Sequence, residues 1–150
     1  MRLRDLLDNE TVKCDLESVD KEECFEELID LLVRAGRITD RAGALKAIHD
    51  RETQGTTGIG RGVAVPHAKH GSIPKLVASC GVSREGIEFD SFDGESVHLV
   101  ILLLANTDQA GPHVQALAEV ARVVKIPGFY RRATQVNNTK EFLDLLDVEE

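Results

Sequence analysis

The chain has 150 residues, the length of one domain, and 42% of them are apolar while 29% are charged. This balance is typical of a folded globular chain and excludes a disordered or collagen-like one. The net charge of −8 argues against nucleic-acid binding, which normally needs a basic stripe. Aromatic residues make up only 4%, so platforms that stack bases or sugars are not expected either.

Cysteine content and the ends of the chain indicate the cellular compartment. Cys14, Cys24 and Cys80 are odd in number and widely spaced, which matches neither a disulfide framework nor a zinc motif. We expect them to be small buried side chains. The N-terminus lacks the apolar segment of a signal peptide, and the longest apolar run, 97–105, is too short to span a bilayer. A soluble, cytoplasmic protein is therefore expected.

The first part of the chain predicts a short strand and two helices. The strand is expected at 12–16. Asp20 then begins a capping box, in which its side chain caps a helix and Glu23 reaches back. Apolar residues recur behind it at helical spacing until a glycine stops the helix. Thr39 is expected to cap a second helix that ends near Glu52.

The middle of the chain predicts a loop followed by strands. Four glycines within residues 55–62 indicate a loop, which runs into a β-branched stretch at 63–67. Further strands are expected at 76–83 and, more briefly, at 86–89. After a turn at Asp93-Gly94-Glu95, nearly all residues from 97 to 104 are apolar, as in a strand covered on both faces.

Three helices are expected in the last third of the chain. Gly111-Pro112 opens the first, a short one covers 129–133, and Asn138 with Glu141 caps the last. The buried stripe of the first is predicted to consist of Val114, Leu117, Ala118, Ala121 and Val124. Because helices alternate with buried strands, we expect one α/β domain over residues 1–150, a sandwich with a mostly parallel or mixed sheet.

The glycine-rich stretch is the first candidate for chemistry. No Gly-Lys-Ser/Thr closes it, so it is not a Walker A loop. Its glycines run Gly58-x-Gly60-x-Gly62 and a strand follows, so it is not a dinucleotide fingerprint. It leads instead to Pro66-His67, where the fixed backbone angle of proline would present the histidine rigidly. Glycine loops are also often plain turns, and spacing alone does not separate the two interpretations.

Histidines and one arginine are the other candidates. His67 and His70 are three residues apart, and His113 falls in the first turn of a predicted helix. A zinc site formed by these three is conceivable, but carboxylate or cysteine companions are not arranged around it. His49 and His98 are expected to be structural. Arg51, alone a solvated charge, would offer a phosphoryl group its planar donor fork if it lay beside a reactive histidine.

These residues resemble a known family, the enzyme IIA domains of the bacterial phosphotransferase system of the fructose/mannitol/nitrogen-regulatory type. The resemblance extends over essentially the whole chain. It rests on Asp50-Arg51-Glu52, Thr57-Gly58-Ile59-Gly60-Arg61-Gly62-Val63-Ala64-Val65-Pro66-His67, Gly86-Ile87-Glu88-Phe89-Asp90 before the strand at 97–105, His113 at the start of a helix, Arg131-Arg132 and Glu141-Phe142-Leu143. The family implies a mixed five-stranded sheet flanked by helices.

The resemblance also implies a mechanism. His67 would accept a phosphoryl group, on its Nε2 nitrogen, from a phosphocarrier protein similar to HPr. Arg51 would neutralise the phosphoryl oxygens, and His113 would be a hydrogen-bond partner of His67. The group would pass to a cysteine of a IIB partner or, in the nitrogen-regulatory branch, its presence would control target proteins. No cofactor, no metal, no nucleic acid and no insertion into a membrane is implied.

Two positions depart from the family pattern. Many members have glycine directly after the active histidine, whereas this chain has Ala68, which resists left-handed backbone angles. His70 is an unusual additional histidine that we expect to be inert. Around His67, the side chains of Ile59, Val63 and Val65 are expected to form a small apolar collar for protein docking.

Alternatives remain from the sequence alone. A nitrogen-regulatory relay protein is favoured over a sugar-transport IIA component because no IIB or membrane segment is fused to the chain. A degenerate member would bind partners without phosphorylation of His67, although Arg51, His67 and His113 are all present. A third alternative is a small metal-dependent hydrolase that uses His67, His70 and His113.

Overall fold

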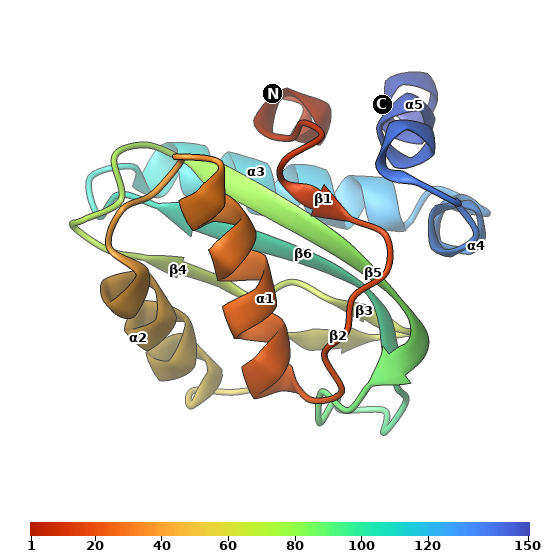
Figure 1. Ribbon diagram of the computed structural model, residues 1–150, viewed down its shortest axis with the longest axis horizontal. Helices are drawn as coiled ribbons and strands as arrows, with labels where there is room; N and C mark the ends of the chain where they lie inside the picture. The colour runs from red at the N-terminus through yellow and green to blue at the C-terminus, as the bar shows by residue number, and fades with distance from the viewer.

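A mixed sheet with helices on both faces forms the body of the molecule in the computed structural model, which describes all residues 1–150 (Figure 1). The strands are β1 (Val12–Lys13), β2 (Gly58–Gly60), β3 (Val63–Ala64), β4 (His67–Lys69), β5 (Val77–Ile87) and β6 (Val97–Ala105). The helices are η1 (Leu3–Leu6), α1 (Lys21–Arg34), α2 (Arg41–Glu52), α3 (Ala110–Val124), α4 (Phe129–Thr134) and α5 (Thr139–Glu149). No helix has both the length and the apolar character needed to cross a membrane.

The strand order is β1-β5-β6-β3-β2, with β4 also paired to β6, and three of the five pairings are parallel. This confirms the mixed α/β class. The sheet has six strands where five were expected, because the strand parallel to β6 is interrupted. Val63 pairs with Leu99 and His67 with Leu103, so β3 and β4 keep one register along β6. Pro66 between them has no N–H to donate to the ladder.

Strand β6 divides the interior into two cores, as its apolar sequence predicted. Leu99, Ile101 and Leu103 face the core beneath α3, α4 and α5. Val100, Leu102 and Leu104 alternate with them and face the core beneath α1 and α2. Figure 1 shows these two helical layers on opposite sides of β5 and β6.

The helix caps confirm two expectations and correct one. Asp20 accepts the N–H of Glu23 at 2.9 Å, and Asn138 accepts that of Glu141 at 2.9 Å. The second helix was assigned the wrong cap, however. Asp40 rather than Thr39 accepts an N–H, that of Gly43 at 2.9 Å. Both side chains are good caps and adjacent in sequence, so the pattern alone did not fix the position.

The sequence predicted a loop for the glycine-rich stretch, and the structure corrects this prediction. Its middle, β2, pairs with β3 in a tight antiparallel hairpin. Positive φ angles at Gly60, Arg61 and Gly62 close the turn. A Cβ added at Gly62 would lie 2.1 Å from the Tyr130 hydroxyl oxygen, so glycine is needed there for space as well as for its backbone angle.

The buried stripe predicted for α3 is only partly right: Leu117 and Val124 are partly buried and pack against the core, but other members do not. Val114 is 64% exposed, and Ala118 is exposed too. The side chains that face the core are those of His113, Ala116, Val120 and Val123, a stripe with the same helical spacing one position earlier. The apolar pattern of the sequence did not predict this stripe, because its first residue, His113, is not apolar. The corrected register turns His113 inward.

The remaining differences are small. The strand expected at 12–16 is limited to β1, and the stretches at 76–83 and 86–89 merge largely into the single strand β5. The turn before β6 and the helix expected at 129–133 are present. All three cysteines are free and buried, as predicted.

Candidate functional site

His67 is the first residue of β4, at an edge of the sheet against which α2 packs. Its Nδ1 lies 2.8 Å from the carbonyl oxygen of Val65. A carbonyl oxygen only accepts hydrogen bonds, so Nδ1 holds the proton and donates it. In the neutral ring Nε2 then keeps its lone pair. The Pro66 turn between the two residues therefore fixes both the tautomer and the orientation of the imidazole.

The surroundings of His67 favour its neutral form. Burial lowers the pKa of His67 below its usual 6.5, because the charged ring loses hydration, and the positive charge of Arg51 lowers it further. The hydrogen bond to Val65 opposes this shift without reversing it. A ring that is neutral near pH 7 and has a free Nε2 is a competent nucleophile.

His113 lies beside His67, as the sequence predicted. It belongs to the first turn of α3, and the centroids of the two rings are 5.6 Å apart with the ring planes inclined at 50°. His113 is buried, and its Nε2 has no hydrogen-bond partner. Burial lowers the pKa of His113, and His67 and Lys69 lower it further. An unpartnered buried nitrogen costs free energy, so it marks a position where a ligand atom would be stabilising.

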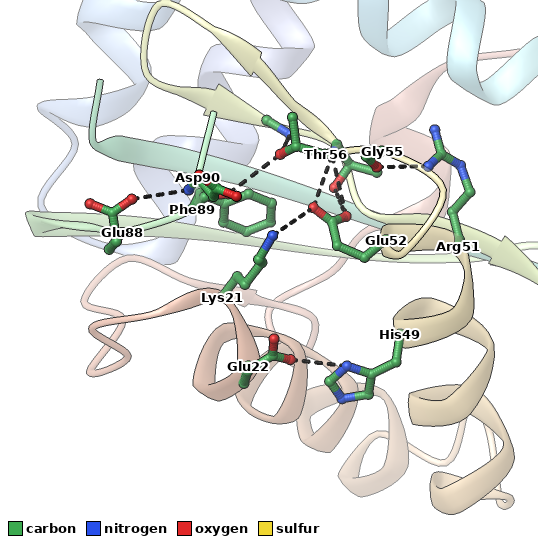
Figure 2. Close-up of polar contacts among 12 residues, drawn as sticks. Lys21, Glu22, His49, Arg51, Glu52, Gly55, Thr56, Glu88, Phe89 and Asp90 are labelled. Carbon is green, nitrogen blue, oxygen red and sulfur yellow. Dashed lines mark hydrogen bonds and ion pairs between the residues drawn. The ribbon is translucent and has the colours of Figure 1, made fainter. Parts of the chain in front are cut away.

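Arg51 is the penultimate residue of α2, and one of its guanidinium nitrogens donates to the carbonyl of Gly55 at 3.0 Å (Figure 2). This single bond uses one of the five guanidinium N–H donors and leaves the others available. Arg51, His67 and His113 all line the same cleft, which has a volume of about 620 Å³. The structure thus brings together the three predicted site residues from α2, β4 and α3.

Two more cations border this cleft. Lys46 is paired with Asp50 at 2.7 Å, whereas the ammonium group of Lys69 is without an acidic partner. Because side chains alternate along a strand, Lys69 points to the same side of β4 as His67. The cleft therefore carries positive charge and favours an anionic group next to Nε2 of His67.

His70 also borders the cleft but is engaged elsewhere. Its Nδ1 accepts the backbone N–H of Ser72 at 3.1 Å and lies 2.7 Å from the Ser72 hydroxyl. No group of three or more His, Cys, Asp or Glu residues is placed to hold a metal ion. The zinc arrangement of His67, His70 and His113 considered from the sequence therefore gains no support from the geometry.

Glu52 was named from the sequence only as part of a motif and as the end of a helix, and its role was missed. Its carboxylate accepts the N–H of Thr57 at 3.1 Å and the Thr57 hydroxyl at 2.7 Å. It also faces Lys21 at 3.4 Å (Figure 2). The Glu52 side chain is only 6% exposed. These bonds attach the end of α2 to the glycine-rich stretch and so fix the base of Arg51. A charged residue directly after Arg51 was the only signal in the sequence.

The departures from the family pattern have structural explanations. Ala68 lies within β4 with its side chain buried, and its φ is not positive, so no glycine is needed for its torsion.

The apolar collar expected around His67 is largely wrong: Val63 and Val65 are buried in the core, and only Ile59, which is 47% exposed, faces solvent. Strand alternation placed both valines inward.

His49 and His98 have structural surroundings, as expected. His49 pairs with Glu22 at 2.9 Å (Figure 2). It also packs edge-on against Phe25. Nδ1 of His98 lies 2.8 Å from the carbonyl oxygen of Ser83. Neither residue lines the cleft.

Comparison with known proteins places this arrangement in a family. The chain is 39% identical over 102 residues to the fructose-specific EIIA component of Haloferax volcanii, a match that covers 68% of this chain and 66% of that protein. It is 31% identical over 147 residues to the fructose-specific EIIABC component of Bacillus subtilis. The match covers 98% of this chain but only 23% of that longer protein.

Solved structures agree with the sequence comparison. The nitrogen regulatory protein IIA-Ntr from Neisseria meningitidis superimposes with a TM-score of 0.87 at 28% identity, over 96% of this chain and 98% of that one. The family model for the phosphoenolpyruvate-dependent sugar phosphotransferase system, EIIA 2, matches residues 5–148. The chain therefore belongs to the EIIA 2 family of the phosphoenolpyruvate-dependent sugar phosphotransferase system.

Proposed function

We propose that the chain, residues 1–150 acting as one type-2 EIIA unit, relays a phosphoryl group through Nε2 of His67. The observation that carries this proposal is the hydrogen bond from Nδ1 of His67 to Val65, which leaves Nε2 free and unprotonated in a cleft shared with Arg51 and His113. The donor is a histidine phosphocarrier protein similar to HPr. Membership of the family supports this assignment.

The transfer is an exchange of one N–P bond for another. The lone pair on Nε2 of His67 forms the new bond, while the bond to the donor imidazole breaks and that ring leaves with the electron pair. Positive charge develops on the His67 ring as the bond forms. The Val65 carbonyl, which already accepts from Nδ1, stabilises this charge.

The other two site residues stabilise the phosphoryl group. The remaining guanidinium donors of Arg51 bind the phosphoryl oxygens, whose charge is spread over three atoms in a loose transition state. His113 donates from its unpartnered Nε2 to one of these oxygens and is not itself the nucleophile. Both groups act by position and charge, which is the main requirement of this chemistry.

The destination of the phosphoryl group separates two candidate roles. We favour a nitrogen-regulatory role, in which phosphorylation of His67 alters the binding of a target protein by adding about two negative charges. The likeness to IIA-Ntr over almost the whole of both chains supports it. The alternative is a transport component that donates to a IIB cysteine, and the 39% identity to a fructose-specific EIIA component supports that role.

Two measurements test these assignments. The purified chain is incubated with phosphoenolpyruvate, enzyme I and a phosphocarrier, and its intact mass should rise by one phosphoryl group. No mass gain would refute the relay. Phosphorylated and unphosphorylated chain are then used in pull-downs from cell extract, alongside transfer assays to the IIB domains of the same cell. A target that prefers one form supports regulation, and efficient transfer to a sugar-specific IIB with no such target supports transport.

A further inference from the structure

A second hollow, which we call the basic groove, lies at the opposite end of α3 from His113. The hairpin turn between β2 and β3 forms one wall, and the connection from α3 to α4 forms the other. Its volume is about 670 Å³, within the range of small-molecule sites. It shares no residue with the cleft around His67.

The basic groove concentrates positive charge in a chain whose net charge is −8. Arg61, Lys125 and Arg131 line it, and no aspartate or glutamate does. Most cations of the molecule are bound by carboxylates or carbonyls. The charged ends without such a partner belong to Arg61, Lys69, Lys75, Lys125 and Arg131. Three of these five unpaired cations therefore meet in one groove.

Arg61 is held in place by a strained backbone. Its φ of 57° is unusual for a residue with a side chain, and glycines with positive φ lie on both sides of it. Asp93 accepts the backbone N–H of Arg61 at 2.9 Å and so fixes the turn from outside the groove. The Asp93 carboxylate thus binds the backbone of Arg61, and the guanidinium group of Arg61 stays unpaired. A left-handed backbone is strained at arginine, and glycine would avoid that strain.

The uncharged lining of the groove is apolar and aromatic. Val63, Val124 and Ile126 contribute to it, and Ile59 is 47% exposed at its rim. Tyr130 reaches the hairpin turn because Gly62 leaves room for its ring.

We propose that the basic groove binds a small organic phosphate that carries an aromatic ring, of the type represented by a nucleoside monophosphate. The three cations would bind the phosphate, and two of them are arginines that can do so with two parallel hydrogen bonds. The aromatic portion would lie on Tyr130 and the aliphatic side chains. A concave site of this volume suits such a ligand better than the flatter surface of a protein partner. The proposal does not depend on phosphorylation of His67.

Calorimetric titration of the intact chain with AMP tests the proposal. We expect saturable binding that weakens at least fivefold in Arg131→Ala and in Arg61→Gly. Glycine is chosen at position 61 because it adopts the positive φ without strain, so the hairpin is preserved. Lys75→Ala is the matched control, since Lys75 is exposed and equally unpaired but lies outside the groove. It should bind AMP like the unchanged chain.

Three further titrations define the ligand class. Inorganic phosphate and adenosine should each bind at least fivefold more weakly than AMP, because each lacks one half of the contacts. A hexapeptide of glutamate should also bind more weakly. Absence of saturable AMP binding, equal AMP affinity in the groove variants, inorganic phosphate or adenosine binding as tightly as AMP, or tighter binding of the acidic peptide would each overturn the proposal.

Discussion

The cleft around His67 and the basic groove lie at the two ends of α3, and they differ in how His67 and Arg51 on the one side and the groove cations on the other are bonded. In the cleft, the backbone holds the central groups: Val65 fixes the His67 ring and Gly55 fixes Arg51. In the groove, Arg61 and its two neighbouring cations are unpaired. A group that forms a bond must be oriented, whereas a group that attracts a ligand needs free donors. The contrast agrees with the reaction proposed for the cleft and the binding proposed for the groove.

The largest expected effect is that of His67→Ala, which should abolish phosphoryl acceptance while the protein stays folded, because the bond from Nδ1 to Val65 leaves the lone pair of this ring on Nε2. Intact mass after incubation with the phosphocarrier system measures it, and circular dichroism checks the fold. His70→Ala is the matched control and should still gain the phosphoryl mass. Acceptance of a phosphoryl group by the His67→Ala variant would show that the cleft reacts through another residue.

Arg51→Ala should slow phosphoryl transfer tens-fold, because the loss of a charge-assisted contact to the phosphoryl oxygens costs about 2 kcal/mol. Single-turnover kinetics with phosphorylated carrier measure this. Arg34→Ala is a close control, since Arg34 also lies near the end of a helix and donates to a backbone carbonyl. AMP binding to the groove should not change in either variant. Transfer at the normal rate in Arg51→Ala would assign the charge role to another cation, such as Lys69.

His113→Ala should separate the two halves of the relay. We expect phosphorylation of His67 to persist, while transfer to a downstream cysteine slows about tenfold, which corresponds to about 1.4 kcal/mol of lost stabilisation. Mass measurement follows the first step and loss of label to a IIB domain follows the second. If the variant accepts no phosphoryl group at all, His113 takes part in the attack and the division of roles is wrong.

The smallest effect concerns pH. Burial lowers the pKa of His67, so the ring stays neutral at pH 7 and the rate of acceptance should fall only below 6.5, as Nε2 becomes protonated. The unfolded chain binds this proton more readily than the folded one, so the contribution of His67 to folding stability also decreases as pH falls below 6.5. Titration of the ring by NMR measures the pKa, and Arg51→Ala should raise it. A pKa above 6.5 in the unchanged chain would contradict the neutral nucleophile.

Local patterns in the sequence predicted most of the fold. The cap of α1 at Asp20, the doubly covered strand β6 and the cap of α5 at Asn138 were all predicted, because each depends on neighbouring residues and on apolar period. The cap of α2 was assigned to Thr39 instead of Asp40, a difference of one residue between two equally suitable side chains. Such errors leave the architecture unchanged.

The site was only partly predictable. The presence of Arg51, His67 and His113 in the sequence, together with the family resemblance, named its members. Their meeting in one cleft required the packing of α2 and α3 against the edge of the sheet. The buried stripe of α3 was predicted one position too late, and that register decides whether His113 faces the cleft or solvent. Glu52, which joins α2 to Thr57, had no recognisable signal because its partner is on another element.

By itself, the sequence determined the class of fold and the caps of two helices, and it supplied the candidate site residues, since these follow from local chemistry, spacing and the family motif. The tertiary structure alone decided the tautomer of His67, the inward turn of His113 and the gathering of Arg61, Lys125 and Arg131 in one groove. Each of these depends on atoms brought together from distant parts of the chain. Linear periodicity records which face of an element is apolar, but the contacts across elements set which nitrogen holds a proton and which charges remain unpaired.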